Sequence, residues 1–189
     1  MVKRLPPRNL VRSPPTMAVR IPATGGTPDA PAIPRQSGSA MRKTRNPAVM
    51  SDFDGGVVTV VNNPQSGGIN TSAKVGKMVK NAGQIWGGSW IGLAAPIDFS
   101  TSKTFKVKVF SPRVGAKLLL KVENQNDGGI SFEKEVTTTV AGAWETLTFD
   151  YSAINTARTY QKIVLIFDLG TAGDGSANFT FLFDDITLN

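Results

Sequence analysis

The chain has 189 residues with a formal net charge of +7, and it contains neither cysteine nor histidine. This composition excludes disulfides, a thiol nucleophile, a histidine general base and metal sites built from thiolate or imidazole ligands. The length leaves room for one sizeable domain with an appendage. No apolar run is long enough to span a bilayer, so we expect no membrane partner.

Residues 1–50 differ sharply in composition from the rest of the chain. They hold nine of the 12 prolines and nine Lys or Arg residues against one acid, and every Phe, Trp and Tyr lies after them. A segment without aromatics cannot build a core, and proline drives its backbone toward extended geometry. We therefore expect two parts, a basic, extended, anchoring arm over 1–50 and a globular domain over 51–189.

Short apolar stretches between the prolines of the arm, at 10–11, 17–19, 21 and 33, suit docking into shallow grooves of a neighbouring protein. The basic residues also fit a nucleic acid, but they are spread more thinly than in typical nucleic-acid-binding arms. Pro6, Pro7, Arg8 and Arg12 interrupt the apolar stretch that a secretory signal needs. We expect protein partners for the arm, with nucleic acid as the less favoured alternative.

Residues 51–189 alternate short apolar segments with turns rich in Gly, Asn, Asp and Pro, which is the pattern of an antiparallel sandwich or barrel. The segment "TFKVKVF" (104–110) alternates cleanly, and "KIVLIFDLG" (162–170) is apolar on both faces, as expected of a central strand. No stretch has a sustained helical period. The pattern predicts strands near 52–61, 73–80, 84–94, 103–111, 116–124, 130–139, 144–150, 161–168 and 178–188.

A family resemblance rests on "GINTSAKVGKMVKNAGQIWGGSWIGLAAPIDFSTSKTFKVKVFSP" (68–112), "WETLTFDYS" (144–152), "IVLIFDLG" (163–170) and "GDGSANFTFLFDDITL" (173–188). These segments resemble the jelly-roll carbohydrate-binding modules attached to bacterial laminarinases and other polysaccharide-degrading enzymes. The resemblance covers about residues 51–189 and none of the arm. It implies an all-β, antiparallel jelly-roll β-sandwich, and its motifs indicate the type of module better than they indicate the ligand.

Such modules hold sugars on aromatic rings, because the C–H face of a sugar packs against a ring while nearby polar groups bond to the hydroxyls. In "QIWGGSWIGL" (84–93), Trp86 and Trp90 share one face if the segment is a strand. The alternative is that both rings fill the core. We prefer the core position for Trp86, and for Trp90 we weigh core and sugar platform equally. The resemblance also places Trp144 at a buried sandwich edge.

Polar partners for a sugar are sought in the loop "ENQNDGG" (123–129), where Asn124, Gln125 and Asn126 are the candidates. The same residues are also what turn chemistry selects in a loop. Tyr151 borders another loop and is a candidate exposed ring.

Two acidic segments, "SDFDGG" (51–56) and "FDDITLN" (183–189), bracket the domain. The resemblance to jelly-roll modules implies that the first and last strands are neighbours, and carboxylates there often hold a structural Ca²⁺ in such modules. Calcium takes six to eight oxygen ligands. Asp52, Asp54, Asp184 and Asp185 are therefore candidate calcium ligands, and a set of solvated turn acids is the alternative.

The chain offers little for catalysis, since Glu123, Glu133, Glu135 and Glu145 occur in no motif that pairs carboxylates across a cleft.

A sandwich with an anchoring arm and no secretion signal suits a particle that assembles inside a cell. We first expect a non-catalytic virion structural protein, a phage capsid decoration or head-fibre component at the virion surface. Its arm would bind other virion proteins and its sandwich would contact polysaccharide. The alternatives are an extracellular, secreted or enzyme-associated carbohydrate-binding module for β-glucan, and a jelly-roll coat protein whose arm binds nucleic acid.

Overall fold

The computed structural model describes residues 50–189. The arm, apart from its last residue, lies outside the described residues, so its extended form and its partners stay predictions. Over residues 50–189 no helix is long and apolar enough to cross a membrane. The described residues form strands joined by turns and one short 3₁₀ helix, η2 (Ala177–Phe179). The strands are β1 (Met50–Phe53), β2 (Gly56–Asn62), β3 (Lys74–Lys80), β4 (Gly88–Gly92), β5 (Thr104–Phe110), β6 (Lys117–Glu123), β7 (Ser131–Thr137), β8 (Trp144–Asp150), β9 (Lys162–Phe167) and β10 (Thr180–Leu188).

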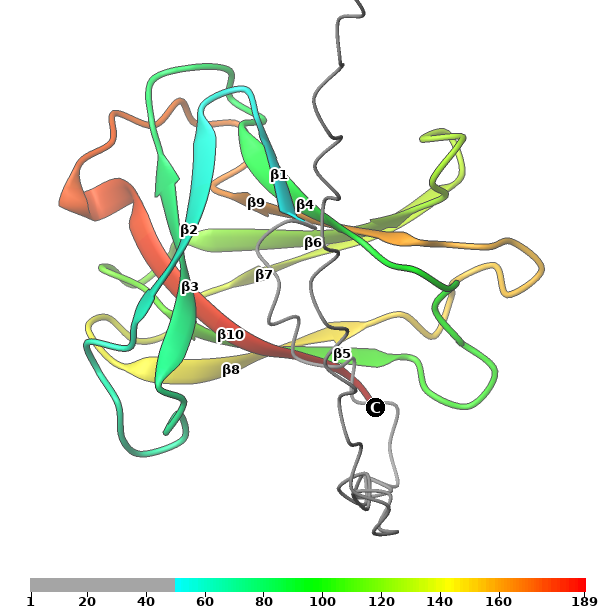
Figure 1. Cartoon of the computed structure of the whole chain (residues 1–189), viewed down its shortest axis with the longest axis horizontal. Coiled ribbons are helices and arrows are strands. Elements are labelled where there is room, and N and C mark those ends of the chain that lie inside the picture. Colours follow the sequence, from blue (N-terminus) through cyan, green and yellow to red (C-terminus); the bar gives the residue numbers. More distant parts are fainter. Residues whose placement is uncertain (1–49) are drawn as a thin grey trace, which may run out of the picture. The chain divides into compact units, whose positions relative to one another are not determined.

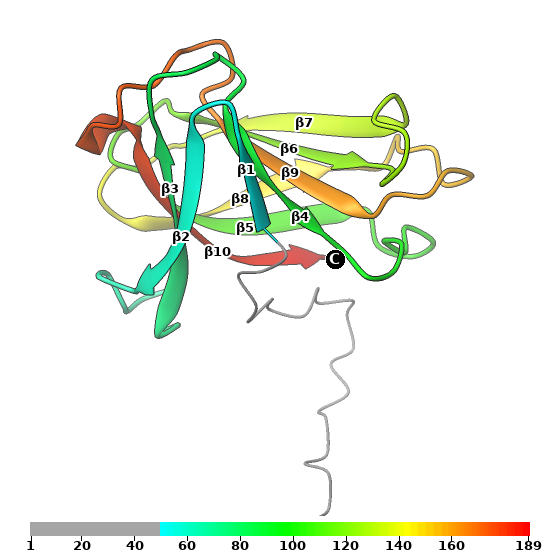
Figure 2. The same ribbon diagram turned by 45° about the horizontal axis from the view of Figure 1, so that its top comes forward.

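The strands form two antiparallel sheets that lie one over the other (Figures 1 and 2). Sheet A has the order β1-β4-β9-β6-β7, and sheet B has the order β2-β3-β10-β5-β8. The pairs β2–β3 and β6–β7 are consecutive in the chain, whereas the other neighbours, such as β1 and β4 or β3 and β10, are not, as expected of a sandwich with crossing connections. The prediction of an all-β, antiparallel jelly-roll sandwich is confirmed.

The core lies between the sheets and is built by the alternation that the sequence displays. On β5 the side chains of Phe105, Val107 and Val109 are fully buried, while Lys106 is exposed. On the central strand β9, Ile163 through Phe167 are all buried. Ile163, Leu165 and Phe167 lie in the main core, and Val164 and Ile166 pack with apolar side chains of neighbouring strands on the other face. The predictions of an alternating strand and of a doubly apolar central strand are both confirmed.

Two predicted strands differ substantially from the structure, and the others agree with it to within two residues at each end. The segment expected as one strand over 52–61 is two strands, β1 and β2, separated by a turn at Asp54 and Gly55 with φ values of 51° and 99°. Asp-Gly is a favoured pair at such positive φ angles. The strand expected from residue 84 begins only at Gly88, because Gly87 N–H donates to the carbonyl of Gln84 and closes a turn there (3.0 Å).

The β1–β2 turn carries the chain from sheet A to sheet B, and the two sheets approach closely beside it. A Cβ on Gly56 would lie 2.5 Å from the backbone nitrogen and oxygen of Gly88. Alanine at position 56 must therefore push two backbones apart. We expect Gly56→Ala to lower the free energy of unfolding by about 1–3 kcal/mol, as overpacking does.

Urea denaturation measures this effect, and Gly128→Ala is the matched control. At Gly128 a Cβ would meet only the side-chain oxygen of Glu123, at 4.0 Å. The control should change the free energy of unfolding by less than about 0.5 kcal/mol. Equal effects of the two substitutions would show that the contact between Gly56 and Gly88 is not tight.

Candidate functional site

The outer face of sheet A carries apolar side chains where a solvated face would be polar. Leu119, Val164 and Ile166 point away from the main core and are buried, and Phe53 and Trp90 pack against them. These five residues come from β1, β4, β9 and β6, so the apolar strip crosses four neighbouring strands. An antiparallel sheet with one solvated face normally alternates apolar-in and polar-out. The strip is thus the feature that sets this face apart.

Trp90 lies on β4, between the edge strand β1 and the central strand β9. It stands opposite Ser51 on β1 and opposite Val164 on β9. Val164 in turn stands opposite Lys121 on β6, which stands opposite Glu133 on β7. Because directly opposed residues share a face, one row across sheet A runs from an indole through an aliphatic side chain to two charged groups.

The charged part of the outer face is organised by ion pairs. Lys121 Nζ lies 2.8 Å from Glu123 Oε1, and Lys162 Nζ lies 4.0 Å from the other oxygen of the same carboxylate. Lys117 Nζ lies 2.8 Å from Glu135 Oε1, and this hydrogen bond raises the pKa of Lys117. The face therefore offers donors and acceptors beside the apolar strip, and most of the net charge cancels locally.

The indole of Trp90 is half-buried and already has a partner on one face. Lys162 Nζ lies 5.3 Å from the centroid of the ring, within the range of a cation–π contact. A ligand that stacks on this face of the indole has to displace the ammonium group. Gly88 does not clear room for such a ligand, since a Cβ there would meet the Leu165 carbonyl oxygen at 2.5 Å. Packing between strands explains that glycine.

Trp86 lies in the turn before β4 and not on the strand. Its side chain is 46% exposed, so the prediction that Trp86 fills the core is wrong. The indole N–H donates to Asp54 Oδ2 (2.7 Å), which fixes the ring beside the β1–β2 turn. The structure consequently does not present Trp86 and Trp90 as two rings on one strand face.

Of the three polar loop candidates, Asn124 is occupied by the loop itself. Its amide donates to the Thr159 carbonyl (3.0 Å) and hydroxyl (2.9 Å), and its oxygen accepts the N–H groups of Asn126 and Asp127. The side chains of Gln125 and Asn126 are exposed. This loop follows Glu123, at the end of the charged part of the outer face, so these two side chains remain available at its border.

Tyr151 cannot stack on a ligand, because its ring is fully buried. Its hydroxyl donates to the backbone oxygen of Leu120 (2.6 Å), and Tyr160 is buried as well. The expectation that Tyr151 is an exposed ring is therefore wrong. The aromatic residues around this loop belong to the core.

The four candidate calcium ligands are not brought together. β1 pairs only with β4 in sheet A, whereas β10 lies between β3 and β5 in sheet B, so the expectation that the first and last strands are neighbours is wrong. Asp52 accepts the Val58 N–H (3.0 Å), and Asp54 accepts the Trp86 indole N–H. Asp184 is buried on β10, and Asp185 pairs with Lys108 (2.8 Å). Within residues 50–189 no group of three or more His, Cys, Asp or Glu side chains is placed to hold a metal ion.

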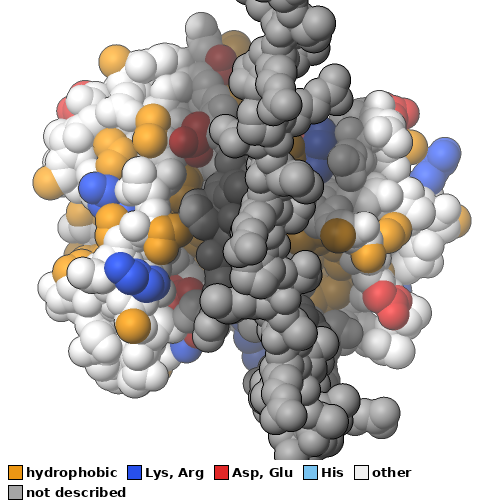
Figure 3. Space-filling view, in the orientation of Figure 1, with side chains coloured by type: hydrophobic (Ala, Val, Ile, Leu, Met, Phe, Trp, Pro, Cys, Tyr) orange, Lys and Arg blue, Asp and Glu red, His pale blue; other side chains and the backbone are white. Residues whose placement is uncertain are grey.

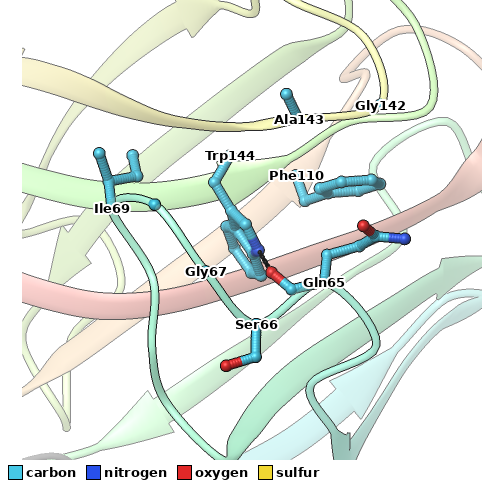
Figure 4. Close-up of a pocket in the computed structure, with 9 residues that line it drawn as sticks. Gln65, Ser66, Gly67, Ile69, Phe110, Gly142, Ala143 and Trp144 are labelled. Atoms are coloured by element: carbon cyan, nitrogen blue, oxygen red, sulfur yellow. Dashed lines mark hydrogen bonds between the residues drawn. The ribbon is translucent and has the colours of Figure 1, made fainter.

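Sequence reasoning missed one feature, a cavity beside the start of β8. Trp144 lines it, although the resemblance placed this ring in the core; the indole is half-buried and its N–H donates to the Gln65 carbonyl (2.8 Å) (Figure 4). The cavity also includes loop residues 65–69, far from Trp144 in the sequence. The glycine pair at 67–68 is the only local signal of an unusual loop.

The fold is an antiparallel β-sandwich, and solved carbohydrate-binding modules share this fold. A family 11 carbohydrate-binding module from Clostridium thermocellum, in complex with a β-1,3-1,4-mixed-linked tetrasaccharide, matches with a TM-score of 0.56 and 10% identity, over 77% of this chain and 91% of that chain. A xylan-binding domain of family 22 from Paenibacillus barcinonensis Xyn10C matches with a TM-score of 0.50 and 12% identity, over 76% and 92%.

A third structure, an exo-β-agarase, matches with a TM-score of 0.57 and 15% identity over 79% of this chain. This chain spans only 24% of that enzyme. No protein-family model matches the sequence, and no curated protein matches it. The resemblance to jelly-roll carbohydrate-binding modules is confirmed as a likeness of fold.

Proposed function

We propose that this chain is a non-catalytic carbohydrate-binding module that binds a neutral β-linked polysaccharide on the outer face of sheet A. The observation that carries the proposal is Trp90, a half-buried indole set in an apolar strip beside a ladder of Lys and Glu side chains. A sugar ring needs both surfaces, since its C–H face packs on the indole and its hydroxyls bond to the charged groups. The β-1,3-1,4-mixed-linked tetrasaccharide and the xylan in the names of the structural neighbours guide the choice of probe.

The acidic residues of this face support binding over hydrolysis. Glu123 and Glu135 are each paired with lysine, at 2.8 Å, and so serve as hydrogen-bond acceptors held in place. A glycosidase needs one carboxyl group that carries a proton and a second that flanks the same bond. Incubation with mixed-linked β-glucan or xylan should release no reducing sugar.

Trp90→Ala is the test of the site. We expect the affinity for soluble mixed-linked β-glucan or xylan to fall about tenfold, equivalent to losing roughly 1.4 kcal/mol of ring contact. Affinity gel electrophoresis or calorimetry measures it, and circular dichroism confirms that the variant is folded. Trp86→Ala is the matched control, because that indole is exposed but lies off the sheet, and it should change the affinity less than about twofold.

Two results would contradict the proposal. The first is an intact chain that binds neither polysaccharide nor any other neutral β-linked glycan. The second is an affinity that survives Trp90→Ala and is lost with Trp86→Ala, which would move the site to the β1–β2 turn.

The other expected functions rest on residues 1–49, which lie outside the described part of the chain. A virion location and partners bound through the arm find no support in the fold or in the outer face of sheet A, and they stay predictions. The sandwich itself does not favour nucleic acid, since residues 51–189 hold 12 basic and 13 acidic side chains. Figure 3 shows the two kinds interspersed over the part of the described surface that is visible in that view.

A further inference from the structure

A cavity of about 420 Å³ lies on the outer side of sheet B, on the sheet opposite the outer face of sheet A. Its wall comes from three segments: the loop between β2 and β3, the end of β5 and the start of β8. Phe110 and Trp144 are directly opposed on β5 and β8 and point away from the core, because their neighbours Val109 and Leu147 point into it. The cavity therefore shares no residue with the outer face of sheet A.

The cavity is formed without a ligand, because hydrogen bonds hold its loop. Trp144 donates its indole N–H to the Gln65 carbonyl, which ties the loop to the start of β8 (2.8 Å). Asn63 braces the loop from inside, since its amide donates to the Ser72 carbonyl (3.0 Å) and its oxygen accepts the Gln65 N–H (2.9 Å). A pair of backbone hydrogen bonds between Gly67 and Asn70 closes the tip (2.9 and 3.0 Å). The cavity is open to solvent, since residues 65–69 are exposed, and its volume lies in the range of roughly 300–1,000 Å³ that is typical of ligand clefts.

The chemistry of the wall selects a neutral ligand with one apolar face. No charged side chain lines the cavity, so a phosphate, carboxylate or ammonium group would find no counter-charge in its wall. Trp144 and Phe110 supply aromatic surface, with ring centroids 5.8 Å apart and planes at 64°. Ile69 borders the cavity and is 49% exposed. Gln65 and Ser66 supply polar atoms, and Figure 4 shows the Gln65 side chain extending beside Phe110.

We infer that this cavity is a second sugar-binding site, which takes a neutral monosaccharide or disaccharide unit, such as a chain end, against Trp144. The ligand class rests on the proposed function, whereas the residues and the sheet are different. The ring of a neutral sugar offers an apolar face for the indole and hydroxyls for Gln65 and Ser66. A module with sites on both sheets can bridge two chains of a polysaccharide or bind one with higher avidity.

A chain in which Trp144 is the only remaining indole tests the inference directly. The protein has three tryptophans, so the full-length variant with Trp86→Phe and Trp90→Phe reports only on the cavity. It is titrated with glucose, galactose, xylose and their β-linked disaccharides. We expect at least one of these sugars to change the Trp144 fluorescence in a saturable way, with a dissociation constant of about 1 mM or below.

Substitutions then connect the signal to the cavity. Ile69→Ala should weaken this binding about threefold or more, because it removes apolar contact at the cavity wall. Val60→Ala is the matched control: Val60 is 50% exposed on β2, does not line the cavity, and its substitution should leave the affinity unchanged. In case the double variant does not fold, the indole N–H signal of Trp144 in a ¹H–¹⁵N spectrum of the wild-type chain gives the same readout.

The result that overturns the inference is an unchanged Trp144 signal at sugar concentrations well above about 1 mM. A response to the apolar probe p-cresol without a response to any sugar also overturns it, because the cavity would then take an apolar group. Neither result bears on the proposed site on the outer face of sheet A, which Trp90→Ala tests separately. Conversely, loss of the proposed function at Trp90 with a saturable Trp144 signal would leave the cavity as the chain's sugar site.

Discussion

Replacing Lys80 with methionine is expected to lower the free energy of unfolding by about 3–5 kcal/mol, the range for removing one partner of a buried charged network. Lys80 is the last residue of β3, and only 1% of its surface is exposed. Its ammonium group donates to the backbone oxygens of Phe167 (2.7 Å), Asp168 (2.7 Å) and Ile85 (3.0 Å). The side chain thereby joins sheet B to the end of β9 in sheet A and to the turn before β4.

The large effect follows from what the substitution leaves behind. Methionine fills a similar volume but supplies no donor, so three carbonyl oxygens lose a charged partner in a site shielded from water. Burial lowers the pKa of Lys80, and attraction to Asp168 opposes that change. Asp168 is itself buried; it accepts the Lys117 N–H (2.9 Å) and pairs with Arg113. The lysine is therefore one member of a network that extends into sheet A.

Urea denaturation of the two proteins checks this prediction, and Lys106→Met provides the control. Lys106 is exposed on β5 of the same sheet, so its substitution should change the free energy of unfolding by less than about 0.5 kcal/mol. The dependence of the free energy on urea concentration should be the same for all three proteins. A Lys80→Met variant within about 1 kcal/mol of the wild type would show that the three carbonyls find other partners.

The strands of the core could be predicted because their signal is local. Phe105, Val107 and Val109 alternate with lysines, and the run at 163–167 is apolar at every position. Both patterns depend on the two-residue period of a strand and need no knowledge of the neighbours. The likeness to carbohydrate-binding modules added the sandwich, since it supplied the long-range pairing that periodicity lacks.

The parts that failed depend on contacts between distant segments. Lys80 lies in "KVGKMVK" (74–80), where every lysine looks like a solvent-facing residue. Only the packing of the end of β3 in sheet B against the end of β9 in sheet A and the turn before β4 reveals its three carbonyl partners. The prediction placed Trp86 on a strand, but residues 84–87 form a turn and β4 begins only at Gly88. The cavity brings Gln65 to Trp144 across 79 positions, and no local pattern records such a contact.

Tyr151 was also predicted wrongly from local sequence, because its position beside a loop suggested an exposed ring that could contact a ligand. Its ring packs in the core, at 4.9 Å from Phe105, 5.1 Å from Phe132 and 6.1 Å from Phe99 between ring centroids. We expect Tyr151→Ala to lower the free energy of unfolding by about 3–5 kcal/mol, as aromatic truncations in a core do. The variant should still bind polysaccharide under conditions where it is folded, since the ring faces no ligand.

Tyr151→Phe separates the hydroxyl group from the ring and gives a pH dependence of known sign. At neutral pH it should lower the free energy of unfolding by about 1–2 kcal/mol, because the Leu120 oxygen loses its buried donor.

Burial raises the pKa of Tyr151 well above its ordinary value of 10.0, with a smaller contribution from Glu133. The folded protein therefore keeps the phenolic proton at alkaline pH, while the unfolded chain releases it above about pH 10. The wild type should lose about 1.4 kcal/mol of stability per pH unit in that range from this one group, and the phenylalanine variant should not. Urea denaturation of both proteins from about pH 8 to about pH 11 measures the difference, and Tyr160 and the lysines contribute equally to both curves. The difference in free energy of unfolding between the two proteins should be constant below about pH 10 and should shrink above it. A difference that stays constant throughout would mean that Tyr151 ionises as easily in the folded chain as in the unfolded one.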